Sequence, residues 1–337
     1  MKESSDHTSI SEWINSIENG QIRSLSRAIT LLESTREEDQ HRAGNLLKKS
    51  LARLSAIERA PTIRIGISGP PGVGKSSYIE SLGMHLLSLG HRVCVLAVDP
   101  SSQLSGGSIL GDKTRMDRLS AQPNAFIRPS PSQQVLGGVT HATQSIMSLC
   151  ELAGYSIILI ETVGIGQSEG AVADMVDCFV LLNQPGSGDE LQGIKRGVLE
   201  FADVLLVNKM DGMTKSLALQ TLQSLRSTSQ LINHSLKNYQ VPTLGISSTQ
   251  DIGITESWQA ITKFLEQAVA EGFFEQKRKL QQEHWFQKLC EYYWLHYLQA
   301  ARHTSSVRNT LVKEIQSGKK SVVEAAQEFY QSLFSKD

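Results

Sequence analysis

A glycine-rich stretch, GPPGVGKSS at residues 69–77, follows the apolar run TIRIGIS and ends in a lysine and two serines. It matches the pattern G-x-x-x-x-G-K-[ST] between a predicted strand and a predicted helix. The glycines would let backbone N–H groups surround phosphate oxygens at the positive end of the helix. Lys75 would reach the β- and γ-phosphates, and the Ser76 hydroxyl would bind Mg²⁺. The residues expected to contact the nucleotide here are Gly69, Pro70, Pro71, Gly72, Val73, Gly74, Lys75, Ser76 and Ser77.

A second motif indicates the base. In VLLVNKMD, at 204–211, the pattern N-K-x-D follows a buried strand. The carboxylate of Asp211 can accept two hydrogen bonds from the N1–H and the exocyclic amine of guanine, whereas adenine has no matching pair of donors. A Ser-Ser-Thr loop after the run PTLGI would close the pocket with backbone amides. We therefore predict GTP and GDP as ligands, bound by Asn208, Lys209, Asp211, Ser247, Ser248 and Thr249.

Two more carboxylates stand where predicted strands end, Glu161 in ILIETVGIG and Asp99 in AVDPSS. A carboxylate beside the phosphates can hold Mg²⁺ through water, and the amide of Gly164 can contact the γ-phosphate. A single carboxylate of this kind is more often a solvated loop charge or a helix cap. Because three strand ends would converge, we predict that Asp99 and Glu161 are directed at magnesium.

Longer segments give the chain a family resemblance. VDPSSQLSGGSILGDKTRM (98–116), ETVGIGQSE (161–169) and PGSGDELQGIKRG (185–197) resemble the MeaB/ArgK group of the G3E class of P-loop GTPases. RSLSRAITLLEST and EHWFQKLCEYYW resemble the helical segments at the two ends of that family. The resemblance implies an α/β fold of the G3E/SIMIBI-like P-loop NTPase class, with a mostly parallel sheet flanked by helices and helical extensions at both ends.

The resemblance also implies a function. It is that of a homodimeric GTPase, hydrolysing GTP to GDP and phosphate, which acts as a chaperone of methylmalonyl-CoA mutase or a related acyl-CoA mutase. Such a chaperone gates the delivery of adenosylcobalamin to the mutase and protects the mutase from inactivation. The resemblance leaves open whether a cobalamin adenosyltransferase joins the complex.

Three segments of this chain are similar to the switch regions of that family. Residues 98–116 resemble switch I, residues 161–169 resemble switch II, and residues 185–197 resemble a third switch that reads the nucleotide state to a partner. Slow intrinsic turnover is expected, because no water-orienting glutamine can be assigned. The residues that the resemblance and the motifs together imply are Lys75, Asp112, Glu161 and Gly164 for catalysis, and Ser76, Asp99, Asp112 and Glu161 for Mg²⁺.

Two other functions stay open. A metallochaperone GTPase for a metalloenzyme shares the G3E core, but such proteins usually carry His-rich or Cys-x-x-Cys tracts, and the nine histidines of this chain are scattered. A transport-associated kinase, an older label of the same family, would need an ATP site, and the N-K-x-D motif argues against one.

A parallel sheet must position these residues. Short β-branched runs alternate with helical stretches over residues 61–270, and several are apolar on both faces, which is typical of a parallel sheet covered by helices. The runs are TIRIGIS, RVCVLAV, AFIRP, YSIILIE, DCFVLL, DVLLVNK and PTLGIS. In the helix after the first run, four apolar residues would share one face before Gly90 ends the helix: Ile79, Leu82, Leu86 and Leu89.

Helices are expected at both ends of the chain. Residues 1–60 form a predicted helical extension that Pro61 breaks, with one apolar stripe at Ile22, Leu25, Ile29 and Leu32. Residues 271–337 show no strand pattern. Their aromatic stripe is typical of either a core-facing helix or a dimer arm, and the resemblance favours the arm. The stripe consists of Trp285, Leu289, Tyr292, Tyr293 and His296, of which His296 is assigned no chemistry.

Composition excludes some partners. The 33 basic and 34 acidic residues give a formal net charge of −1, so we expect no nucleic-acid partner. The apolar runs are too short to cross a membrane, and the first residues lack the apolar core of a signal peptide. The four cysteines have no metal-ligand spacing, and three lie in or beside apolar runs, which favours buried thiols in a reducing cytoplasm: Cys94, Cys150, Cys178 and Cys290.

Overall fold

The computed structural model divides the chain into two compact units, residues 1–284 and 285–337. It describes residues 9–34, 36–99, 116–131, 138–162, 169–186, 196–230, 232, 234–300 and 302–332. The backbone alone is described at 37, 98–99, 130–131, 138–141, 196, 295–300 and 302–305. None of the helices described is long and apolar enough to cross a membrane.

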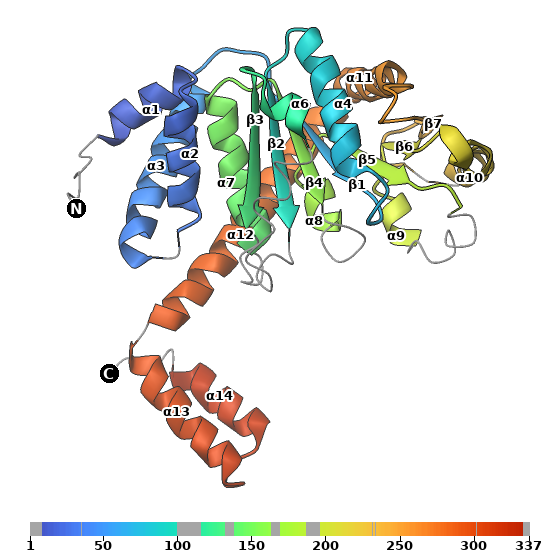
Figure 1. The fold of residues 1–337 in the computed structure, drawn as a ribbon. Coiled ribbons are helices and arrows are strands. Elements are labelled where there is room, and N and C mark those ends of the chain that lie inside the picture. The colour runs from blue at the N-terminus through green and yellow to red at the C-terminus, as the bar shows by residue number, and fades with distance from the viewer. Residues whose placement is uncertain are drawn as a thin grey trace. The chain divides into compact units, whose positions relative to one another are not determined.

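The first unit is built on a parallel sheet of seven strands in the order β3-β2-β4-β1-β5-β6-β7. Each of the seven predicted runs overlaps one strand. Because every pair is parallel, the carboxyl ends of all strands meet at one edge, as the arrowheads of β2 and β3 show in Figure 1. The strands are β1 (Ile63–Ser68), β2 (Val93–Asp99), β3 (Ala125–Pro131), β4 (Ile157–Thr162), β5 (Cys178–Asn183), β6 (Val204–Val207) and β7 (Thr243–Gly245).

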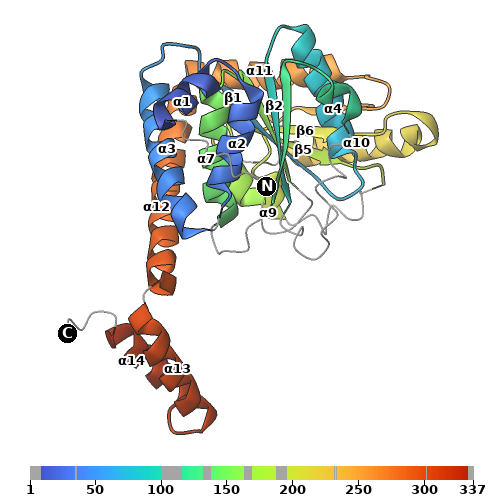
Figure 2. The ribbon, with the colours of Figure 1, turned by 60° about the vertical axis from the view of Figure 1, so that its left-hand side comes forward.

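Helices cover both faces of this sheet, and Figure 2 shows α2, α3 and α7 on one side of the strands and α4 on the other. The helices are α1 (Ile10–Glu18), α2 (Ile22–Leu32), α3 (Glu37–Ser55), α4 (Lys75–Ser88), α6 (Asp117–Ser120), α7 (Gly138–Leu152), α8 (Glu169–Ala173), α9 (Arg196–Leu199), η3 (Gly212–Thr214), α10 (Lys215–Ser229), α11 (Ile254–Ala270) and α12 (Phe273–Ala300). In the part of 271–337 that the structure describes, α12 is followed by α13 (Arg302–Gln316) and α14 (Val322–Ser332), without a strand.

The side chains of the strands alternate between two hydrophobic cores, one on each face of the sheet. Successive side chains of a strand point to opposite faces. Ile65 and Ile67 of β1 join the core under α4, α6 and α11, whereas Ile158 and Ile160 of β4 join the core under α1, α2, α3, α7 and α10. Every residue of β4 and β5 is buried. Burial on both faces explains why these runs lack polar alternation.

Three details of the helices differ from expectation. Leu89, predicted to lie on the inner face of its helix, is 53% exposed because it is the C-cap residue, beyond the last turn of α4. Ile22 is 42% exposed at the first position of α2, while Leu25 and Ile29 are buried as predicted. The third N-terminal helix ends at Ser55, so Pro61 does not itself break it.

The expectation of buried thiols is met by three cysteines. Cys94 of β2 and Cys150 of α7 are buried with their Sγ atoms 3.4 Å apart, and Cys178 of β5 is buried in the opposite core. Cys290 is exposed. Burial raises the pKa of the Cys94 thiol above its ordinary value, which keeps this thiol protonated and unreactive.

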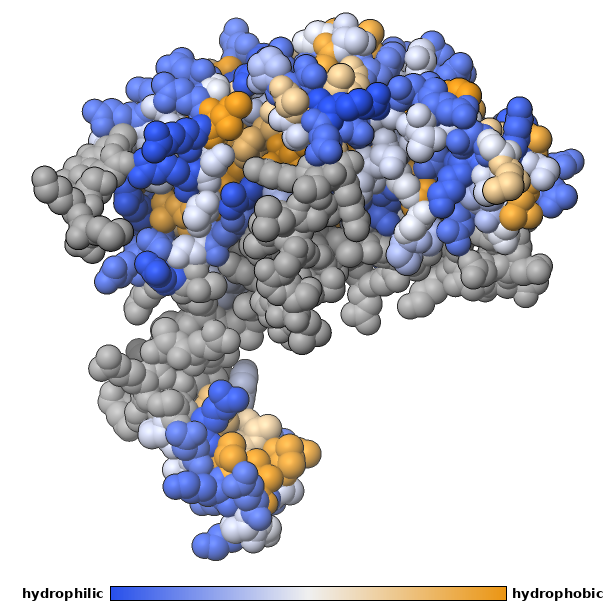
Figure 3. Space-filling model, viewed as in Figure 1, coloured by the Kyte–Doolittle hydropathy of each residue, from blue (hydrophilic) through white to orange (hydrophobic). Residues whose placement is uncertain are grey.

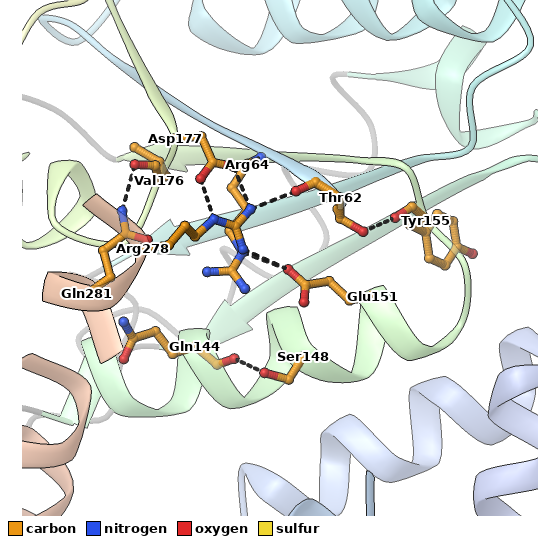
Figure 4. A network of polar contacts seen from close by, with 10 residues as sticks. All are labelled: Thr62, Arg64, Gln144, Ser148, Glu151, Tyr155, Val176, Asp177, Arg278 and Gln281. Atoms are coloured by element: carbon orange, nitrogen blue, oxygen red, sulfur yellow. Dashed lines mark hydrogen bonds and ion pairs between the residues drawn. The ribbon is translucent and has the colours of Figure 1, made fainter. Parts of the chain in front are cut away.

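A buried ionic cluster fixes the start of α12 to the sheet. Arg278 donates from Nε and Nη2 to both carboxylate oxygens of Asp177, over 2.6 and 2.7 Å, and from Nη2 to the carbonyl oxygen of Thr62. Arg64 donates to Glu151 over 2.6 Å. Figure 4 shows the guanidinium groups of Arg64 and Arg278 between the two acids. The charges balance, so we interpret the cluster as structural.

Replacing Arg278 with methionine should lower the free energy of unfolding of the first unit by about 2–3 kcal/mol, because it leaves Asp177 buried without its bidentate partner. Only 1% of the Asp177 side chain is exposed, against 21% for Arg278. Urea unfolding measures the effect. The exposed neighbour Lys279 provides the control, since Lys279→Met should change stability by less than about 0.5 kcal/mol. Equal unfolding midpoints for the two variants would show that the cluster does not contribute to the free energy of unfolding of this unit.

Candidate nucleotide-binding site

The glycine-rich loop joins β1 to α4 at the carboxyl edge of the sheet. Gly69 and Gly74 have φ values of 151° and 96°, and neither position has room for a side chain. A Cβ at Gly69 would lie 2.5 Å from the carbonyl oxygen of Leu182 in β5, and one at Gly74 would lie 2.6 Å from Nδ2 of Asn208. Glycine is therefore needed at both positions, because the loop approaches β5 and the base motif so closely.

The ammonium group of Lys75 lies inside this loop. Its Nζ donates to the carbonyl oxygens of Gly69 and Pro70, over 2.9 and 3.2 Å, and the residue is buried. Burial lowers the pKa of Lys75, while the carboxylates of Glu161 and Glu169 oppose that change. An anion in the loop would meet a cation with little water around it, and such a pair attracts more strongly than the same pair in water.

Ser76 and Glu161 come together although 85 positions separate them. The Ser76 hydroxyl, in the first turn of α4, donates to Oε1 of Glu161 over 2.9 Å. Glu161 lies in β4 in register with Ile67 of β1 and Ala97 of β2, which places it in the middle of the sheet edge. Both groups offer oxygen atoms, which Mg²⁺ prefers, and they are close enough to reach one ion. The pair therefore fits a magnesium site, with Glu161 binding directly or through water.

Asn208 connects three segments of the site. Its Nδ2 donates to the carbonyl oxygen of Val73 over 2.9 Å, and its Oδ1 accepts from the backbone N and the hydroxyl of Ser248, over 3.1 and 3.0 Å. Lys209 has a φ of 61°, and its Nζ donates to the carbonyl oxygen of Gly72 over 2.8 Å. The first two residues of N-K-x-D thus hold the phosphate loop, and Asn208 also holds the Ser-Ser-Thr loop.

Asp211 lies opposite the Ser-Ser-Thr loop. Its Oδ2 accepts from the hydroxyl of Thr249 over 3.1 Å. Two backbone hydrogen bonds of 3.0 Å between Ser247 and Ile252 close the loop. A carboxylate has more acceptor positions than one hydroxyl uses, so Asp211 can accept from guanine while it still holds Thr249. The arrangement can therefore read the two donors of a guanine edge.

The remaining predicted residues are only partly described. The backbone of Asp99 ends β2, in register with Pro131. Asp112 and Gly164 lie outside the described residues, so their roles stay predictions. The described phosphate-loop and base residues all lie at the same edge of the sheet, because they follow strands that run parallel to one another.

Sequence reasoning missed three contributors to the site. Glu169 is buried at the start of α8, and its carboxylate opposes the lowering of the pKa of Lys75. Thr162 donates to the hydroxyl of Ser68 over 2.9 Å, which joins the ends of β4 and β1. Ser81, in the second turn of α4, donates to the carbonyl oxygen of Ser248 over 2.7 Å. Neither Thr162 nor Ser81 stands at a position that a motif specifies. Glu169 is distinguished only as the last residue of the segment 161–169.

Comparison with known proteins agrees with this geometry. A family model described as methylmalonyl Co-A mutase-associated GTPase MeaB matches residues 25–303. The chain belongs to the MeaB family. The family resemblance and the predicted fold class are thereby confirmed, and this MeaB-family protein is a P-loop GTPase that binds guanine nucleotides.

Relatives of this MeaB-family protein include a mouse protein named methylmalonic aciduria type A homolog, mitochondrial. It is 48% identical over 277 residues, which make up 81% of this chain and 67% of the mouse protein. GTPase ArgK of Escherichia coli strain K12 is 40% identical over 286 residues, 85% of each chain. The crystal structure of a LAO/AO transport system kinase is similar with a TM-score of 0.72 and 30% identity, over 99% of this chain and 100% of that one.

Proposed function

We propose that this GTPase is a chaperone of an adenosylcobalamin-dependent acyl-CoA mutase, most simply methylmalonyl-CoA mutase. It would gate the delivery of adenosylcobalamin to the mutase and protect the mutase from inactivation. The observation that carries the proposal is membership of a family described as mutase-associated, in a chain that retains the lysine, serine and carboxylate of a hydrolytic site. Buried thiols fit a reducing cytoplasm as its compartment.

Each site residue has a proposed role. Lys75 would neutralise the β- and γ-phosphates, and backbone N–H groups of the phosphate loop would cradle them. Ser76 and Glu161, with Asp99 and Asp112, would hold Mg²⁺, which when bound neutralises charge on the transferred phosphoryl group. Gly164 would contact the γ-phosphate. In the base pocket, Asp211 would read guanine, and the other members would hold the pocket in shape: Asn208, Lys209, Ser247, Ser248 and Thr249.

The segment 185–197 is proposed to report the nucleotide state to the mutase. It follows β5, which pairs with β1 on one side and β6 on the other. The carbonyl oxygen of Asn183, at the end of β5, accepts from the backbone N of Asn208 over 3.0 Å. The segment therefore starts between the strand that leads into the phosphate loop and the strand that leads into the base motif. A change at the start of the segment could therefore reach both motifs through the end of β5.

Adding an acyl-CoA mutase should accelerate GTP hydrolysis by this protein, and GTP should change the rate at which adenosylcobalamin reaches the mutase. Stopped-flow hydrolysis with methylmalonyl-CoA mutase measures the first effect, and cobalamin absorbance measures the second. In a variant carrying Lys195→Ala and Arg196→Ala, GTP affinity should stay within a few-fold of native while the response to mutase is lost, because these charges lie in 185–197. No acceleration of the native protein by any acyl-CoA mutase would refute the chaperone function. A variant that responds normally would refute the segment's role alone.

The C-terminal helices are proposed to be a dimerisation arm. In the second unit, α13 and α14 contact each other and bury Leu311 and Ala325. Val322, Val323 and Tyr330 remain 67%, 66% and 63% exposed, and Figure 3 shows apolar side chains gathered on this unit. Exposed apolar groups of this kind are typical of interfaces. We propose residues 1–60 as a helical extension, 61–270 as the GTPase domain and 271–337 as the arm of a homodimer. Sedimentation equilibrium can test whether the protein is a dimer.

One further partner and one alternative function can be tested with the same protein. A cobalamin adenosyltransferase is proposed as a further member of the complex, and co-purification with the GTP-bound protein would reveal it. The name of the similar solved structure, a transport system kinase, makes phosphoryl transfer a second candidate function, against which the N-K-x-D motif argues. Radiolabelled γ-phosphate appearing on a protein, rather than as free phosphate, would favour that candidate over hydrolysis.

A further inference from the structure

Ser81 connects the helix of the phosphate loop to the proposed base pocket. It lies in the second turn of α4, whose first turn holds Lys75 and Ser76. Its hydroxyl is buried and donates to the carbonyl oxygen of Ser248 over 2.7 Å. The backbone N and hydroxyl of Ser248 are already held by Asn208. The loop is thus fixed from two directions, by the base motif and by α4.

A second connection runs from α4 to the same loop through α6. The backbone N of Arg118 donates to Oε1 of Glu80 over 2.8 Å, so Glu80 satisfies an N–H group at the start of α6. The guanidinium of Arg118 lies 3.7 Å from Glu80 and 3.5 Å from Oδ2 of Asp251. Arg118 therefore bridges a carboxylate of α4 and a carboxylate of the base loop.

Two features show that this arrangement is specific, one close approach and one unusual backbone conformation. Leu119 of α6 lies so near Gly83 that a Cβ at that glycine would be 2.6 Å from a methyl group of Leu119. Asp251 has a φ of 54°, a conformation that costs energy for a residue other than glycine.

We propose that Ser81 is a positioning residue for guanine recognition, with the Arg118–Asp251 pair as its weaker second connection. Ser81 touches no part of the nucleotide in this assignment. It sets the distance between the base loop and the helix that carries Lys75 and Ser76, so the phosphate and base contacts are made by one rigid body. The inference rests on the proposed assignment of residues 247–249 to the base pocket.

This role predicts a particular division of kinetic effects. Without the Ser81 hydrogen bond, the base loop must become ordered each time a base binds. The free energy of that ordering weakens nucleotide binding. An interaction lost equally from the ground state and the transition state raises KM and leaves kcat unchanged. Ser81→Ala should therefore raise the KM for GTP about five-fold, which is the effect of one ordinary hydrogen bond, and change kcat by less than about two-fold.

Affinity measurements separate the base from the phosphates. Ser81→Ala should weaken GDP binding about five-fold, and should leave the binding of inorganic tripolyphosphate within about two-fold of native, because that probe has no base. The matched control is Ser88→Ala on the same helix, whose exposed hydroxyl donates to the carbonyl oxygen of His85 in its own helix. Arg118→Met should raise KM about two-fold, since its side chain is 53% exposed and such pairs contribute little. This exposed variant should fold even if Ser81→Ala does not.

The outcomes distinguish this inference from the site assignment beneath it. Equal loss of GDP and tripolyphosphate affinity in Ser81→Ala would indicate general loosening of α4 and overturn the inference. Unchanged KM in both Ser81→Ala and Arg118→Met would also overturn it. If instead the native protein binds GDP no better than inosine diphosphate or adenosine diphosphate, the base pocket itself is wrongly assigned. Thermal unfolding of each variant by circular dichroism shows whether it is folded.

Discussion

Asp211→Asn should convert this guanine-selective protein into one that prefers xanthine nucleotides. Asparagine loses an acceptor for the exocyclic amine of guanine and gains an amide donor for the 2-oxo group of xanthine. Loss of charge-assisted hydrogen bonds should weaken GTP binding about 10- to 100-fold. With the gain for xanthosine triphosphate, the ratio of the two affinities should change about 100- to 1,000-fold. Isothermal titration of both nucleotides against both proteins measures the ratio.

The structure supplies a control for this exchange. Asp174→Asn makes the same substitution at a side chain that is 58% exposed, and it should leave both affinities unchanged. Thr249 can keep its bond to the new side chain, because the remaining amide oxygen still accepts from a hydroxyl. Selection of guanine that survives in Asp211→Asn would show that another group reads the base.

Ser76→Ala should abolish magnesium-dependent turnover, with a fall in kcat of about 100- to 1,000-fold, because the hydroxyl is the proposed direct ligand of the ion. Glu161→Ala should also lower kcat strongly. GDP affinity should change little in the second variant, since it depends mainly on the phosphate loop and the base pocket. Single-turnover hydrolysis as a function of magnesium concentration measures both effects.

Glu161→Asp is the matched variant, because it keeps a carboxylate on a shorter side chain. It should retain part of the activity and need more magnesium, which a purely structural role of Glu161 would not predict. In the structure the Ser76 hydroxyl bonds to Glu161 over 2.9 Å, so either alanine substitution also removes that hydrogen bond. If Glu161→Ala hydrolyses GTP at the native rate, this carboxylate has only a structural role.

The sequence by itself determined the local elements and the chemistry they carry. The seven apolar runs indicated the seven strands, because strands buried on both faces must be apolar at nearly every position. The phosphate loop could be located because its backbone needs glycine at Gly69 and Gly74. Guanine was predicted from Asp211 because few side chains match its two donors. Such features depend on near neighbours in the chain, or on a ligand whose chemistry is known.

Tertiary structure alone decided which distant groups meet. Leu89 looked like a core residue and is exposed, because the end of α4 removes it from the helical stripe. Thr162 and Ser81 carry no signal in the sequence, since a single hydroxyl acquires its role only from the atom opposite it. That atom lies 94 positions away for Thr162 and 167 positions away for Ser81. The order of the parallel strands brings each pair together, and strand order depends on the packing of the whole sheet, which spacing along the chain does not encode.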